Sequence, residues 1–227
     1  ALDNDGLGLP DFNTCSFLTK TETLLPAGTG NEDYYLLREW EMNEDGRLYN
    51  MCKMMEALNR TGLYRIDLYP VERSTSLREA LRKPINVLRR RQEDRTGSIK
   101  DYDGKDVLDN YEDLLEKYDS SPHFIANIMV FANSKEDATS ILDAAGSESL
   151  LKGKYSISTF HSNFTVSSFL DGKLDSLENI REHSVLKPGK PGFIICSDVT
   201  QNINLNYLPS LFTLEEIAPF FRLPALY

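Results

Sequence analysis

The three histidines are the residues of this chain best suited to bind a metal ion. His123, His161 and His183 fall in three different predicted elements. No two of them stand at the i, i+3 or i, i+4 spacing that places two ligands on one helical face. The histidines therefore predict no local metal site, and only a site assembled by the tertiary fold stays open.

The cysteines are widely separated and odd in number, and they show no C-x-x-C spacing. Cys15, Cys52 and Cys196 are typical of reduced thiols in a cytosolic protein. Cys196 lies in an apolar run, where a cysteine usually behaves as a small hydrophobic residue rather than as a nucleophile. We expect no catalytic residue, no metal ligand and no cofactor-binding residue in this chain.

Neither the glycine-rich nor the acidic stretches form a ligand-binding motif. A P-loop needs G-x-x-x-x-G-K-[ST], so that backbone N–H groups and a lysine converge on the phosphates, and the chain has no such run. The prolines of the predicted turn at 187–192 lack the N–H donors of a phosphate nest. Stretch 101–106 begins like a calcium loop, but Lys105 occupies position five, where calcium needs an oxygen ligand.

A dense run of positive charge at residues 78–95 opposes the acidic balance of the whole chain. The chain has 25 basic and 35 acidic residues, a net charge of −10, so nucleic-acid binding would need a local basic patch of this kind. A solvated helix face is the favoured interpretation, and contact with nucleic acid or an acidic partner protein is the alternative. The residues available for such contact are Arg82, Lys83, Arg89, Arg90, Arg91 and Arg95.

The elements that position these residues alternate between strand and helix. Residues 1–31 are rich in Gly, Pro, Asn, Asp and Thr and predict an extended N-terminal arm. Apolar runs and alternation at period two predict strands, whereas apolar spacings of three and four predict helices. The predicted strands span 34–42, 63–70, 123–133, 153–162 and 193–199, and the predicted helices span about 47–60, 76–92, 105–118, 135–145 and 174–182.

Local signals predict several helix boundaries. Ser76 forms a capping box with the glutamate three residues later, and Ser134 caps the helix that follows it. Gly62 and Gly146 are predicted to end helices, because glycine tolerates the left-handed conformation found there. Pro84 is predicted to kink its helix.

Strand, helix, strand occurs twice, at 34–69 and at 123–161, with a helical pair between. This order predicts an α+β fold with helices mainly on one face of a mixed or antiparallel sheet, and it suggests two related β-α-β units. The expected organisation is an arm at 1–31, an α+β domain at 32–207 with a helical hairpin inserted at about 76–118, and a linker helix at 208–227. No run approaches the ~18 apolar residues of a membrane span.

The stretch 208–227 carries the clearest helix signal. Thr213 and Glu216 form a capping box, in which each side chain satisfies a backbone N–H group of the other residue. Phe220, Phe221 and Leu223 follow and have no evident place in a self-contained domain. We expect all three to be exposed and to pack against a neighbouring domain.

The phrase LEEIAPFFRLP, with LPSLFT before it, resembles the segment that precedes the motor domain in HerA- and FtsK-like ATPases, including those of conjugation and type IV secretion. The phrases REWEM, LYRIDLYPV, ANSKEDA and GKYSIS fit the layout of that family. The resemblance implies an α+β domain that supports hexamer assembly or docks partner machinery. Walker A, Walker B and an arginine finger are missing, so ATP and Mg²⁺ would belong to a motor domain beyond Tyr227.

The expected function is a non-catalytic assembly or docking domain of an ATP-driven DNA or protein translocase, cytoplasmic and able to dock on a membrane complex. Its partners would be its own motor domain, further copies in a hexamer and proteins of a larger assembly. Two alternatives stay open. One is a free-standing interaction module of a bacterial mobile-element or defence system, and the other is a hydrolase or nuclease whose acidic residues assemble only in the folded chain.

Overall fold

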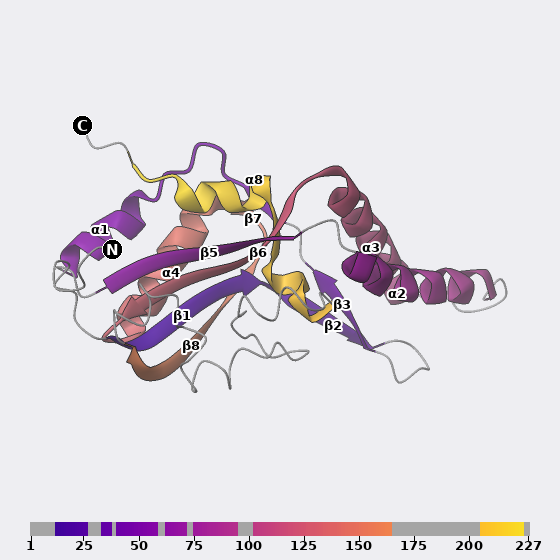
Figure 1. Cartoon of the computed structure of the whole chain (residues 1–227), viewed down its shortest axis with the longest axis horizontal. Coiled ribbons are helices and arrows are strands. Elements are labelled where there is room, and N and C mark those ends of the chain that lie inside the picture. Colours follow the sequence, from indigo (N-terminus) through magenta and orange to yellow (C-terminus); the bar gives the residue numbers. More distant parts are fainter. Residues whose placement is uncertain are drawn as a thin grey trace.

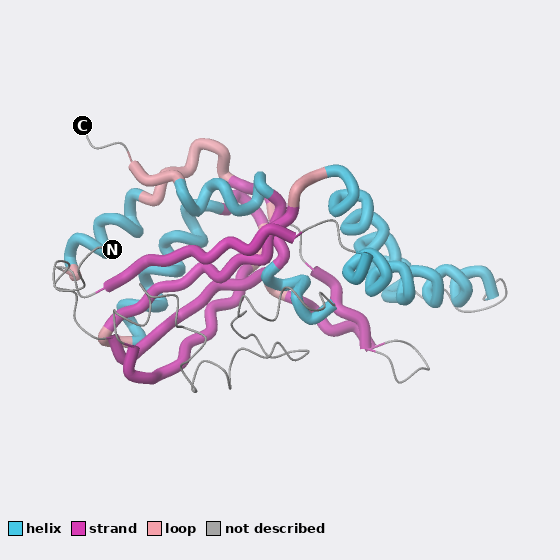
Figure 2. Tube along the Cα trace, in the orientation of Figure 1, coloured by secondary structure: helices cyan, strands magenta, loops and turns pink. Residues whose placement is uncertain are grey.

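The computed structural model describes residues 12–26, 33–37, 40–58, 62–71, 75–94, 102–164 and 205–224. These residues form the predicted α+β fold, built on an antiparallel five-stranded sheet. Helices cover one face of the sheet, and a helical hairpin extends away from the sheet body (Figure 1, Figure 2).

The main sheet has two strands at its centre, β6 (His123–Ala132) and β1 (Phe12–Lys20). The outer strands are β5 (Gly62–Val71), which pairs with β6, and β8 (Tyr155–Phe164), which pairs with β1. Along its other side β6 pairs with β1 at residues 128–132 and with β9 (Leu211–Thr213) at residues 123–125. The C-terminal segment therefore completes the sheet where β1 stops.

Two interleaved β-α-β units build this body. Helix α1 (Tyr49–Ala57) lies between β1 and β5 in the chain, and α4 (Lys135–Ser149) lies between β6 and β8. Because β1 and β5 are both antiparallel to β6, they run parallel to each other and enclose a strand of the second unit. This is the split β-α-β arrangement. Two β-α-β units are present, but the first starts at β1 and not at residue 34.

The core of the body lies between the sheet and helices α1 and α4. Ile128 and Val130 on β6 are fully buried against small residues of α4, among them Ala138 and Ala145. Gly146 was predicted to end α4, but the helix continues to Ser149. The reason for this glycine is packing, because a Cβ there would lie 2.7 Å from the ring of Tyr155.

The helical hairpin consists of α2 (Thr75–Asp94) and α3 (Tyr102–Ser120), as predicted. Its own apolar cluster includes Leu81 and Leu88 of α2 and Tyr111 of α3. The cluster continues into the sheet body through Val71 of β5 and through Leu208 of the short helix η3 (Leu205–Ser210). The hairpin is thus packed on the end of the sheet and is not an isolated arm.

Two short two-stranded sheets lie outside the main sheet. β2 (Glu22–Pro26) pairs with β3 (Asp33–Leu37), and β4 (Glu41–Met42) pairs with β7 (Leu150–Lys152). The single strand predicted at 34–42 is therefore wrong, because its two ends join different partners.

The predicted N-terminal arm is also wrong for residues 12–26. β1 is a central strand, and its residues from Thr14 to Lys20 are all buried. Its polar side chains satisfy one another across strands: the hydroxyls of Ser16 and Thr159 lie 2.8 Å apart, and those of Thr21 and Ser156 lie 3.2 Å apart. The polar residues of this segment, whose composition predicted an extended arm, belong instead to a strand region whose hydroxyl groups pair with those of β8.

The other predicted elements divide into three groups. β5, β6, β8, α1 and α4 are confirmed, as is the Ser134 cap, whose hydroxyl accepts a hydrogen bond from the Asp137 N–H at 3.0 Å. Two boundary predictions are wrong: α2 begins at Thr75, ahead of Ser76, and Gly62 is the buried first residue of β5. The predictions at 174–182, 187–192 and 193–199 lie outside the described residues.

None of the helices in the described ranges combines the length and the apolar character that crossing a bilayer requires.

Candidate functional site

The C-terminal segment carries the side chains around which a site is built. After β9, Thr213 caps helix α8 (Leu214–Ile217) by accepting a hydrogen bond from the Glu216 N–H at 3.2 Å. The Glu216 carboxylate accepts a hydrogen bond from the Thr213 N–H at 2.9 Å, which confirms the predicted capping box. The short helix η4 (Ala218–Phe221) follows directly.

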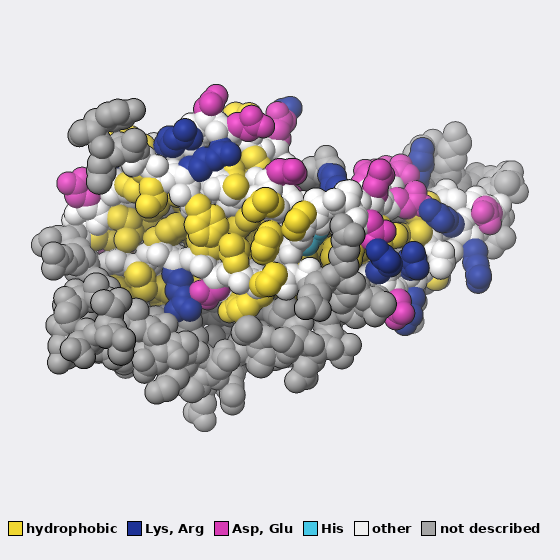
Figure 3. Space-filling view, turned by 45° about the horizontal axis from the view of Figure 1, so that its top comes forward, with side chains coloured by type: hydrophobic (Ala, Val, Ile, Leu, Met, Phe, Trp, Pro, Cys, Tyr) yellow, Lys and Arg dark blue, Asp and Glu magenta, His cyan; other side chains and the backbone are white. Residues whose placement is uncertain are grey.

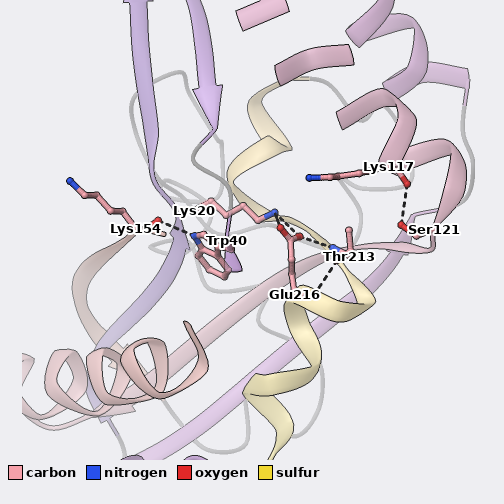
Figure 4. Close-up of polar contacts among 7 residues, drawn as sticks. All are labelled: Lys20, Trp40, Lys117, Ser121, Lys154, Thr213 and Glu216. Carbon is pink, nitrogen blue, oxygen red and sulfur yellow. Dashed lines mark hydrogen bonds and ion pairs between the residues drawn. The ribbon is translucent and has the colours of Figure 1, made fainter. Parts of the chain in front are cut away.

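Glu216 has a second partner from the far end of the chain. The ammonium group of Lys20, at the end of β1, lies 2.7 Å from both carboxylate oxygens of Glu216, and the two side chains are only 7% and 19% exposed. The ammonium also lies 5.0 Å from the centre of the Phe212 ring and 5.8 Å from that of Trp40. Figure 4 shows Lys20 and Glu216 pointing toward each other beside Trp40.

Trp40 connects this ion pair to the core. Its indole N–H donates to the Lys154 carbonyl at 2.9 Å, and its ring lies 5.3 Å from that of Phe212 and 6.0 Å from that of Phe220. The expected exposure of Phe220 is therefore wrong, because this side chain is fully buried in the domain's own core. Residues 208–220 are a structural part of the α+β domain and not the linker that the sequence predicted.

The exposed apolar side chains lie immediately after this buried part. Phe221 is 50% exposed and Leu223 is 61% exposed, as expected from the sequence. The backbone between them is held in place, because the Arg222 carbonyl accepts from the Leu48 N–H at 3.1 Å and its guanidinium donates to the carbonyls of Asn43 and Glu44. The two apolar side chains are therefore presented from a fixed backbone.

A groove of about 1010 Å³ lies beside this segment. Three parts of the chain line it: β4 with the residues next to it, the C-terminal end of α3, and α8 with η4. The last turn of α3 is closed by hydrogen bonds to the Lys117 carbonyl from the Ser121 N–H and hydroxyl, both at 3.0 Å. The lining residues are Trp40, Glu41, Met42, Glu44, Lys117, Ser120, Ser121, Thr213, Leu214, Glu215, Glu216, Ala218, Pro219 and Arg222.

The charges of the groove nearly balance. Glu41 is paired with Lys152 at 2.7 Å and Glu216 with Lys20, so the further charges of the lining are the carboxylates of Glu44 and Glu215 and the cations of Lys117 and Arg222. Leu214 adds an apolar side chain that is 54% exposed. Such a surface suits a segment of another protein or domain that carries apolar side chains and charges of both signs.

The environments of Cys15, Cys52 and His123 favour the neutral forms of these side chains. Burial raises the pKa of Cys15 well above its ordinary value and also raises the pKa of Cys52, so both thiols stay protonated near neutral pH. Burial lowers the pKa of His123. His161 lies on β8, and Cys196 and His183 lie outside the described residues. Within the described ranges no three His, Cys, Asp or Glu residues are placed to hold a metal ion.

The predicted basic residues lie on α2, except for Arg95, which is outside the described ranges. α2 packs beside the acidic helix α3, so part of the positive charge is neutralised within the hairpin. The Arg89 guanidinium lies 2.6 Å from the Glu112 carboxylate, and Arg78 pairs with Asp119. The exposed members are Arg82, Lys83, Arg89 and Arg90, and Arg91 is half-buried.

Sequence reasoning missed Lys20 and Trp40. Lys20 lies in the predicted arm, and its partner Glu216 is 196 residues away, so no local pattern could connect them. Trp40 is the single tryptophan of the chain, and that alone was a usable signal, because a large aromatic residue with an N–H donor commonly marks a core or an interface.

Searches for relatives find none: no family model, no curated protein and no solved structure matches this chain.

Proposed function

We propose that this chain is a non-catalytic docking and assembly domain, of the kind that precedes the motor domain in HerA- and FtsK-like translocases. The observation that carries the proposal is the contrast within the C-terminal segment. Phe220 is fully buried, whereas Phe221 and Leu223 are exposed on a backbone that Arg222 fixes to the domain. Exposed apolar side chains on a rigid support are typical of a protein interface.

The partner we propose for this surface is a motor domain that binds and hydrolyses ATP with Mg²⁺, in a cytoplasmic assembly that can dock on a membrane complex. The groove next to the exposed pair would receive an apolar and charged segment of that partner. A free-standing interaction module would use the same surface, and the two functions differ only in whether the partner belongs to the same chain.

Nucleic acid is a weaker candidate partner for α2. Arg89 and Arg78 already lie against the carboxylates of Glu112 and Asp119, and a phosphate backbone approaching α2 would also meet the acidic helix α3. Steep loss of binding with added salt would be the mark of phosphate contacts.

The decisive experiment determines the residues encoded after Tyr227. We expect a strand that leads into G-x-x-x-x-G-K-[ST]. In the resulting longer protein, Leu223→Asp should uncouple the thermal unfolding of the two domains and increase proteolytic cleavage between them. Leu151→Asp is the matched control, because Leu151 is also 61% exposed but lies on β7 and not on the C-terminal segment. A reading frame without a P-loop, or equal behaviour of the two variants, would contradict the proposal.

A further inference from the structure

Among the strands that the structure describes, β5 is at one edge of the main sheet. It spans ten residues, pairs with β6 along its whole length, and no described strand pairs with its other edge. Figure 3 shows hydrophobic side chains forming a band across the body of the molecule. A long strand edge without a described neighbour is a template for pairing with another strand.

The sequence of β5 is complementary to itself when reversed. The segment LYRIDLY, residues 63–69, has Ile66 at its centre. Antiparallel pairing of two copies about a twofold axis at Ile66 places Arg65 of one copy opposite Asp67 of the other, and the reverse pair forms by symmetry. It also places Tyr64 opposite Leu68, an aromatic–aliphatic pair of the sort that stabilises antiparallel strands.

The charges distinguish this strand from an edge that is protected against pairing. Protected edges commonly carry lysines or other charges that repel a second copy. In β5 the Arg65 guanidinium already lies 2.6 Å from the Asp67 carboxylate of the same strand. Twofold pairing would join two such pairs into a ring of four alternating charges. A register slipped by two residues would instead place Arg65 opposite Arg65 or Asp67 opposite Asp67.

The end of the strand limits the length of the pairing. Pro70 has no N–H to donate, and proline is tolerated on edge strands for that reason. In the twofold register Pro70 stands opposite Gly62, just outside the seven-residue segment. The complementary segment therefore ends where the backbone can no longer support a ladder.

We propose that two copies of this chain associate through β5, with the strands antiparallel about Ile66, to form one continuous sheet across a twofold interface. The contact is isologous, since the same surface is used by both partners. The inference does not rest on the proposed docking function, which uses the C-terminal segment and the groove beside it.

The test measures self-association by sedimentation equilibrium of the wild-type chain and of charge variants. The wild type should form a concentration-dependent dimer. R65D and D67R should each weaken it about ten-fold or more, because each places two like-charge pairs at the interface. The double variant R65D/D67R exchanges the charges and should restore the dimer, a rescue that a merely structural defect would not show.

Circular dichroism of each variant checks folding, and R65Q/D67N replaces any charge variant that fails to fold. This neutral variant should give a dimer of intermediate strength. A wild-type chain that stays monomeric at high concentration would overturn the inference and leave the docking proposal standing. A dimer that is indifferent to R65D and D67R would equally overturn it.

Discussion

The ion pairs of the sheet body and of the helical hairpin differ most in their burial. Lys20 and Glu216 in the body are 7% and 19% exposed, whereas Arg89 and Glu112 in the hairpin are 56% and 35% exposed. Both pairs are short, at 2.7 Å and 2.6 Å. Geometry alone therefore does not reveal which pair the fold depends on.

Exposure to solvent determines how much each ion pair contributes to stability. An exposed pair exchanges good hydration for a modest attraction that salt screens, so its net contribution is small. A buried pair gains more attraction, but either partner left alone would be a charge without water or counter-ion. We infer that the hairpin is held by its apolar cluster around Leu81, Leu88 and Tyr111, whereas the C-terminal segment depends on Lys20.

The largest expected effect comes from breaking the buried pair. Lys20→Met should lower the free energy of unfolding by about 3 kcal/mol, because the Glu216 carboxylate, which is only 19% exposed, loses its cation and keeps the Thr213 N–H as a donor. Urea denaturation measures the change. Lys152→Met is the matched control, since Lys152 also pairs with a glutamate, Glu41, but both side chains are largely exposed, and we expect little change.

A double variant sharpens the interpretation. Lys20→Met combined with Glu216→Gln removes both charges and should recover most of the lost stability. If Lys20→Met were no more destabilising than Lys152→Met, burial would not be what separates the two regions.

Whether the sequence could predict a feature depends on how far apart its residues are in the chain. The N-cap at Ser134 and the capping box at Thr213 were predicted because each depends on residues three positions apart. β6 was found because its apolar run suits a strand that is buried on both faces. Such signals are local, and the fold class follows from their order.

What the sequence could not predict depends on tertiary partners. Lys20 looked like a loop residue, and its burial is visible only once β1, Trp40 and α8 come together. Gly146 looked like a helix end, but close packing with Tyr155 requires the glycine there. Phe220 and Phe221 are adjacent in sequence, and only the fold separates the buried ring from the exposed one.

A smaller effect is expected from His123, which lies where the hairpin meets the body. Its Nδ1 donates to the Ser121 carbonyl at 3.0 Å, and its ring lies 5.2 Å from that of Tyr118. Burial lowers the pKa of His123 and Lys20 lowers it further, although the Ser121 carbonyl and Glu216 act in the opposite direction. The folded chain therefore resists protonation of this imidazole.

The sign of the pH dependence follows from that shift. A histidine whose pKa is lower in the folded state contributes fully above its unfolded pKa of about 6.5, and stability is lost as the pH falls below it. His123→Asn keeps an N–H donor for the Ser121 carbonyl and removes the titration. Its stability should fall less steeply than that of the wild type between about pH 6.5 and 5. Parallel curves from denaturation at each pH would contradict this assignment.

The smallest effect is expected at the hairpin's surface pair. Arg89→Ala should cost only about 0.2–1 kcal/mol, because water solvates the Glu112 carboxylate that remains. A double-mutant cycle with Glu112→Ala measures the coupling between the two side chains, and added salt should reduce that coupling, since exposed charges are screened. A salt-insensitive coupling as large as that of Lys20 with Glu216 would show that α3 shields this pair from solvent. The hairpin would then depend on its charges as the body does, and its basic residues would be bound to α3 and not available to a partner.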